Sequence, residues 1–225
     1  MLSLPLVPVR SIALVFVLSV ALALISSAVP WLARQLRGWR LVSALVVGLV
    51  VGVMADIIGS VRDLPIAPLT DLMVLVVAWS GGLLLGRGMP AHFRPFLLLF
   101  LCLSVLDVVL ALGGYPQTPH VAASSSVLIS ANFFLVLPWG RYEINLVDIL
   151  LITALAEHWR RRGASYLIGF LPSALGFLLA DGVVLATGLV QLPGFPFFTI
   201  GYIVSEGAFR SFSGQRPPPP AMPVR

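Results

Sequence analysis

The chain has no lysine, only one cysteine and few charged residues of either sign. All 14 basic residues are arginines, and charged residues make up 10% of the 225 positions, against roughly 25% in soluble domains. The lone Cys102 excludes an internal disulfide and a cysteine-based metal cluster. The three histidines lie far apart without metal-ligand spacing, so we predict neither a metal nor another cofactor.

Apolar residues are what the sequence has in abundance. They make up 59% of the chain, whose mean hydropathy is +1.02. They form long continuous runs, unlike the alternating pattern of membrane-spanning strands. We therefore predict an all-α polytopic membrane protein in the lipid bilayer. The arginines lie scattered between the runs without interleaved aromatic residues, which argues against nucleic-acid binding.

Proline, glycine and charged residues divide the apolar sequence into seven segments long enough to cross a bilayer. The predicted spans cover residues 11–33, 41–60, 69–86, 95–113, 143–159, 164–188 and 193–209. A softer, serine-rich segment at 121–138 ends in Pro138, which favours a re-entrant or interfacial position. Residues 1–210 then form a single transmembrane domain, and the proline-rich end at 211–225 is expected to be disordered.

The arginines predict how these spans are oriented. With seven spans, eleven of the 14 arginines lie on the side of the first, third and fifth loops and of the C-terminal tail. Counting 121–138 as an eighth span would divide them six and eight. The positive-inside rule favours the first arrangement. We therefore expect an outside N-terminus, a cytoplasmic C-terminus and a bacterial-type cytoplasmic (inner) membrane.

Two aspartates lie within apolar runs predicted to cross the membrane, namely Asp107 and Asp148. A carboxylate in hydrocarbon is costly, which makes each a functional-site hypothesis. Each lies about 9 Å below the outer face, on consecutive antiparallel helices. Two carboxylates that meet suit shared-proton acid–base chemistry. Asp56, Asp71 and Asp181 also fall in the outer half of their spans, so a catalytic dyad, a proton or ion site and a structural polar pair all stay open.

Four segments around and after these aspartates occur in the same order as the motifs of a known protein family. They are LCLSVLDVVLALGG, FFLVLPWG, RYEINLVDILLITALAEH and, at 191–198, QLPGFPFF. The first and third resemble the sixth and seventh helices of the presenilin and signal-peptide-peptidase family of intramembrane aspartyl proteases. The second is similar to the apolar stretch before the family's Gly-x-Gly-Asp motif, and the fourth to the Pro-Ala-Leu motif that opens its last helix. The resemblance covers about residues 95–209.

This resemblance implies an intramembrane aspartyl protease with an Asp107/Asp148 dyad. One ionised carboxylate would activate a water while the other, protonated, polarises the scissile carbonyl. The substrates would be transmembrane helices that unwind locally, and Pro193, Gly194 and Phe195 would bind them. The family has nine helices, of which this chain would keep the last four and three others, in the signal-peptide-peptidase orientation.

The chain departs from the family's motifs at three places. Leu106 stands where the family has a tyrosine, and Asn145 and Val147 replace the glycines before the second aspartate. Pro-Gly-Phe at 193–195 replaces Pro-Ala-Leu. Since glycine lets backbones approach closely, the site is either a divergent active version or one that has lost the reaction.

Two hypotheses from other classes stay beside the protease. A small permease or substrate-binding transport subunit would use the buried carboxylates to bind a proton or cation. A scaffold would use them to hold helices together, so replacing Asp107 by asparagine would change stability alone. Aspartate-dependent uptake into liposomes without proteolysis would favour the transport subunit.

Overall fold

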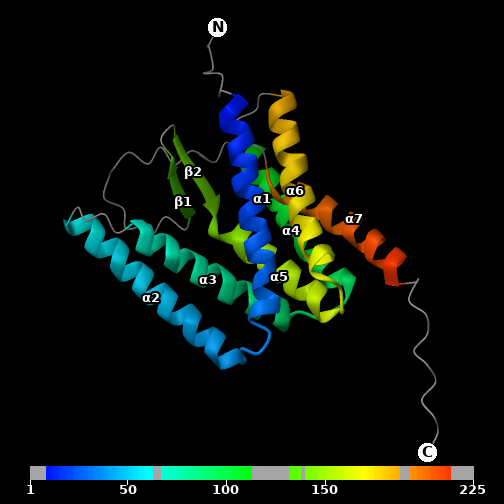
Figure 1. The fold of residues 1–225 in the computed structure, drawn as a ribbon, viewed down its shortest axis with the longest axis horizontal. Coiled ribbons are helices and arrows are strands. Elements are labelled where there is room, and N and C mark those ends of the chain that lie inside the picture. The colour runs from blue at the N-terminus through cyan, green and yellow to red at the C-terminus, as the bar shows by residue number, and fades with distance from the viewer. Residues whose placement is uncertain (1–8, 63–66, 113–131, 138–139, 188–192, 214–225) are drawn as a thin grey trace, which may run out of the picture.

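The computed structural model describes residues 9–62, 67–112, 132–137, 140–187 and 193–213. These residues form seven helices and one two-stranded hairpin (Figure 1). In chain order the elements are α1 (Val9–Leu32), α2 (Gly38–Arg62), α3 (Ala67–Gly88), α4 (Phe93–Leu112), β1 (Asn132–Leu137), β2 (Gly140–Asn145), α5 (Leu146–Arg161), α6 (Tyr166–Thr187) and α7 (Phe195–Ser213). Each predicted span coincides with one helix, which confirms the helical architecture.

Three of the described helices are long and apolar enough to cross a membrane. Their candidate spans are Gly38–Ala55 in α2, Leu69–Gly88 in α3 and Tyr166–Val183 in α6. The outer face of α2 exposes Val46, Val47 and Val50, which suits contact with lipid. These helices indicate an integral membrane protein.

The hairpin between α4 and α5 differs from the purely helical expectation. β1 and β2 pair antiparallel, with Asn132 opposite Asn145 and Leu137 opposite Gly140. Residues 132–137 of the segment expected to be re-entrant or interfacial are thus a strand, while 121–131 and 138 lie outside the described residues. The β-forming sequence FFLV and the adjacent Pro138 disfavour a helix here. Because β2 extends to Asn145, α5 begins at Leu146 and not at 143.

Helix α5 is the central helix of the bundle. It packs against α1, α3 and α6 (Figure 1), and its residues from Leu151 to Trp159 are all buried. Helix α3 approaches it through Gly82 and Gly86. A methyl group added to Gly82 would lie 2.5 Å from the carbonyl oxygen of Leu150. Such close helix contact through small residues is typical of membrane bundles.

Buried Glu157 links α5 to its neighbours at one end of the bundle. It pairs with Arg160 at 2.7 Å and with Arg87 of α3 at 3.2 Å. Arg87 also donates to the carbonyl oxygens of Leu36 and Ala33, at 2.6 and 3.0 Å, just after α1. One carboxylate and one guanidinium thereby join three segments of the chain.

The last turn of α5 makes further contacts at the same end. Arg161 donates to the carbonyl oxygens of Gly86 and Met89, at 2.7 and 2.6 Å, where α3 ends. Cationic groups are favourable at helix C-termini, whose last carbonyls have no intrahelical donor. Arg162, just after α5, pairs with Glu206 of α7. We call this the arginine-rich end of the bundle.

Candidate active site

Asp107 lies in the second half of α4, away from the arginine-rich end. Its side chain is half-buried, and its Oδ2 accepts a hydrogen bond of 3.1 Å from the backbone N–H of Phe195. Phe195 is the first residue of α7. The structure therefore brings together Asp107 and the Pro193-Gly194-Phe195 motif, which are 88 residues apart in sequence.

The start of α7 explains why a carboxylate is stabilised there. The first N–H groups of a helix have no intrahelical acceptor, and the helix dipole favours negative charge at this end. Gly194 caps the helix because its carbonyl accepts from the N–H groups of Phe197 and Phe198, at 3.1 and 3.4 Å. Pro196 has no N–H. The Phe195 N–H is thus an otherwise unpaired donor that Asp107 satisfies.

A polar seam continues from Asp107 along the contact between α4 and α7. The hydroxyl groups of Ser104 and Thr199 lie 2.8 Å apart. Oγ1 of Thr199 also lies 2.9 and 3.3 Å from the carbonyl oxygens of Phe195 and Phe100, to either of which it can donate its single proton. These hydrogen bonds fix α4 and α7 against each other one turn from the carboxylate.

Further along α7, towards the arginine-rich end, Tyr202 joins α4 to α5. Its hydroxyl lies 2.9 Å from Nε2 of His158 and 3.3 Å from the carbonyl oxygen of Phe93. Its ring stacks on the ring of Phe93, with the two centroids 5.0 Å apart, and on the ring of Phe100, with the centroids 5.9 Å apart. Tyr202 and His158 are fully buried, so this contact is a fixed point between the three helices.

Asp148 lies on a different element from Asp107, in the first turn of α5. It is half-buried and follows β2 by three residues, beside the fully buried Ile149. A carboxylate in the first turn of a helix is favourable because of the helix dipole. Since α5 is enclosed by its neighbours, the backbone that carries Asp148 is firmly held.

The two aspartates lie at similar distances along their helices from one ring contact. The ring of Phe96 in α4 packs on that of His158 in α5, with centroids 4.2 Å apart. Asp107 lies eleven residues beyond Phe96, or about 16.5 Å along α4. Asp148 lies ten residues before His158, or about 15 Å along α5. The N-terminal half of α4 meets the C-terminal half of α5, so both counts lead away from the arginine-rich end.

Helices α4, α5 and α7 each contribute residues to one buried hydrophobic cluster. Residues seven positions apart lie on one helix face, two turns from each other. In each helix a site residue lies seven positions from a buried member of one hydrophobic cluster. The pairs are Phe100 with Asp107, Leu155 with Asp148, and Tyr202 with Phe195.

Ser104, Thr199, Tyr202 and His158 are site neighbours that the sequence analysis did not find. Ser104 lies one turn before Asp107, and Thr199 one turn after Phe195. Polar residues at helical spacing from a candidate residue, within an otherwise apolar run, are the signal that points to such a seam. His158 was weighed only as a metal ligand, whereas it bonds to Tyr202.

In the described part of the chain, no group of three or more histidine, cysteine or acidic residues could hold a metal ion. Comparisons with family models, curated proteins and solved structures found no match for this chain. A functional assignment therefore rests on the residues of the site.

Proposed function

We propose that the chain is an intramembrane aspartyl protease-like protein that cleaves transmembrane segments with an Asp107/Asp148 dyad. The observation that carries this proposal is the hydrogen bond from the Phe195 N–H to Asp107. It places a carboxylate in an apolar helix directly against the non-helical backbone that precedes α7. Asp148 lies about as far along α5 from the contact of Phe96 with His158 as Asp107 lies along α4, which supports the same reading.

The chemistry needs two carboxylates, a water and an extended substrate. One carboxylate acts as general base on the water, and the other donates a proton to the scissile carbonyl oxygen. A helical peptide bond is shielded by its own hydrogen bonds, so the substrate unwinds before it is cut. The backbone at Pro193 and Gly194, next to Asp107, is the segment along which that extended chain pairs.

In the membrane we place the arginine-rich end in the cytoplasm. All seven helices then cross the bilayer, with the N-terminus outside and the C-terminus inside. Asp107 and Asp148 lie in the outer half, where water reaches them from the outer face. The clustering of Arg87, Arg161 and Arg162 at one end supports this orientation.

The test is cleavage of a labelled transmembrane peptide by the purified protein in detergent. We expect Asp107→Asn and Asp148→Asn each to abolish cleavage. The asparagine at 107 keeps an oxygen that accepts from the Phe195 N–H, so the fold is retained. Asp71→Asn is the matched control, because Asp71 is another half-buried aspartate in an apolar helix, on α3, which packs mainly against α5 and α2. It should retain full activity.

Three outcomes would contradict the proposal. Full activity without either Asp107 or Asp148 would exclude a dyad. Equal loss in the Asp71 control would point to a general effect on the fold. No cleavage by the parent over a panel of peptides, together with aspartate-dependent uptake into liposomes, would favour a transport subunit.

A further inference from the structure

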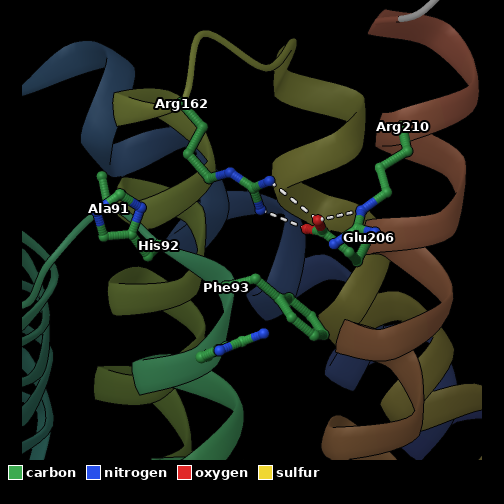
Figure 2. A pocket seen from close by; sticks show the side chains of 7 residues that line it. Ala91, His92, Phe93, Arg162, Glu206 and Arg210 are labelled. Carbon is green, nitrogen blue, oxygen red and sulfur yellow. Dashed lines mark hydrogen bonds and ion pairs between the residues drawn. The ribbon is translucent and has the colours of Figure 1, made fainter.

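A second candidate site lies at the arginine-rich end, far along the helices from Asp107. A pocket of about 410 Å³ opens between the start of α4, the end of α5 and the last turns of α7. Its lining includes His92, Arg94, Arg162, Glu206 and Arg210. Figure 2 shows Arg162 and Arg210 reaching Glu206 from two sides, with His92 and Phe93 across from them. The volume lies within the range of roughly 300–1,000 Å³ of small-ligand pockets.

Arg162 is held in place before any ligand binds. Two of its nitrogens bond to the two oxygens of Glu206, one of them at 3.1 Å. Its guanidinium also lies over the rings of Trp159 and Phe209, 4.6 and 4.7 Å from their centroids. Such cation–π contacts fix a planar guanidinium. The pocket wall is therefore preorganised.

Positive charge in this pocket exceeds negative charge. Three guanidinium groups line it, from Arg94, Arg162 and Arg210, against the single carboxylate of Glu206. Glu206 already bonds to both Arg162 and Arg210. Arg94 is exposed and makes no hydrogen bond or ion pair with any residue that the structure describes. It lies in the first turn of α4, where free N–H groups and the helix dipole add to the attraction for an anion.

Exposed apolar stripes lead away from the pocket on both helices. On α4, Leu98, Leu101 and Val105 follow Arg94 at helical spacing and are 62%, 44% and 64% exposed. On α7, Ile203 and Ile200 precede Arg210 at the same kind of spacing and are also exposed. In a bilayer such faces contact acyl chains. An anion pocket at the head of two apolar stripes has the layout of a phospholipid, with its charge at one end.

We propose that this pocket binds the phosphate of an anionic phospholipid. Arg94 is the principal ligand, and Arg162 and Arg210 complete the basic wall, while the acyl chains lie along the stripes of α4 and α7. Basic pockets between transmembrane helices on the cytoplasmic side are typical sites for anionic head groups. The proposal does not depend on proteolysis.

The test uses the full-length protein in a non-ionic detergent, titrated with short-chain phosphatidylglycerol and followed by thermal unfolding. We expect this lipid to stabilise the parent, while short-chain phosphatidylcholine does not. Arg94→Gln should weaken the apparent affinity for phosphatidylglycerol by about fivefold or more. Arg94→Lys, which keeps the charge, should retain most of it. Arg40→Gln is the charge-matched control, because Arg40 is exposed on α2 and does not line the pocket.

Inorganic phosphate forms the second arm of the experiment, because a free phosphate would use the same residues. If inorganic phosphate stabilises the protein as much as the lipid does, and competes with the lipid, the ligand is free phosphate and not a phospholipid. Equal losses in Arg94→Gln and Arg40→Gln would show non-specific attraction and overturn the pocket. A parent protein whose unfolding midpoint does not change with phosphatidylglycerol would also overturn the pocket. Because Arg94 is exposed, these variants should fold, and their unfolding midpoints without lipid check this directly.

Discussion

At the scale of single residues, Tyr202 shows how much one buried hydroxyl contributes. Tyr202→Phe keeps the ring stacking but removes the hydrogen bonds to His158 and to the carbonyl of Phe93. Among the described residues, Nδ1 of His158 already has no hydrogen-bond partner, so the variant leaves both ring nitrogens unpaired. We expect a loss of about 1–3 kcal/mol in the free energy of unfolding, measured in detergent.

Tyr166→Phe is the control for this prediction. Its hydroxyl donates to the carbonyl oxygen of Leu24 at 2.7 Å, at an exposed position. Water or detergent head groups can replace that bond, so the loss should stay below about 1 kcal/mol. Equal losses in the two variants would mean that burial of the Tyr202 hydroxyl adds nothing to its contribution.

Single residues also show which side-chain contacts can be predicted from sequence patterns. The ion pair of Glu157 with Arg160 is one that sequence patterns can indicate, because the two residues are three positions apart on one helix. The partner of His158 was not predicted. Tyr202 is 44 residues away, and nothing in local spacing indicates which distant helix a buried ring will face.

At the scale of elements, the contact between α3 and α5 depends on Gly82. A methyl group there would lie 2.5 Å from the Leu150 carbonyl oxygen and 2.7 Å from Cβ of Thr153. Backbone cannot yield cheaply, so Gly82→Ala should destabilise the protein by about 1–3 kcal/mol through overpacking. Gly207→Ala is the matched control, since nothing lies within 4 Å of a methyl group added there.

Helix propensity also predicts the direction in which the control variant changes the unfolding midpoint. Alanine is favoured over glycine in a helix by about 1 kcal/mol, so Gly207→Ala should leave the unfolding midpoint unchanged or raise it. Gly82→Ala should lower the midpoint in the same assay. A midpoint for Gly82→Ala at or above that of the parent would show that α3 and α5 are not in such close contact.

The helices were predicted correctly because one signal, the long apolar run, dominates the sequence of each. Long apolar runs bounded by glycine, proline and arginine gave all seven helices of the described chain. The hairpin was missed because residues 132–145 combine a short apolar stretch with polar residues. Short apolar stretches do not distinguish strand from helix by periodicity. The pairing of β1 with β2 decides the structure there.

At the scale of the whole molecule, sequence patterns predict the depth of a residue along its span but not which helices are neighbours. Counting residues along each span puts Asp107 and Asp148 at similar depth, which stays a prediction, because α4 and α5 meet mainly around the contact of Phe96 with His158. The resemblance of motifs assigned Asp107 and Phe195 to one site, but neither it nor any spacing rule predicted the hydrogen bond between them. Rotation and tilt of helices depend on side-chain packing across the bundle, which no single run of sequence contains.

The ion-pair network at the arginine-rich end holds the bundle together across several helices. Glu157 has no exposed side-chain surface and forms ion pairs with both Arg87 and Arg160. Glu157→Gln keeps the shape but leaves two guanidinium groups without their carboxylate, so we expect a loss of about 3 kcal/mol in the free energy of unfolding. The measurement is equilibrium unfolding in mixed micelles, with Arg210→Gln as the control.

Arg210 pairs with Glu206 from an exposed position, where its side chain is 71% accessible. An exposed pair contributes about 0–1 kcal/mol, so the control should lose little. In the double variant Glu157→Gln with Arg160→Gln, the second change should cost less than Arg160→Gln alone, because the lost charge and its partner are coupled. Strict additivity, or a Glu157→Gln loss no larger than that of the control, would mean that the helices are held by apolar packing and not by this buried carboxylate.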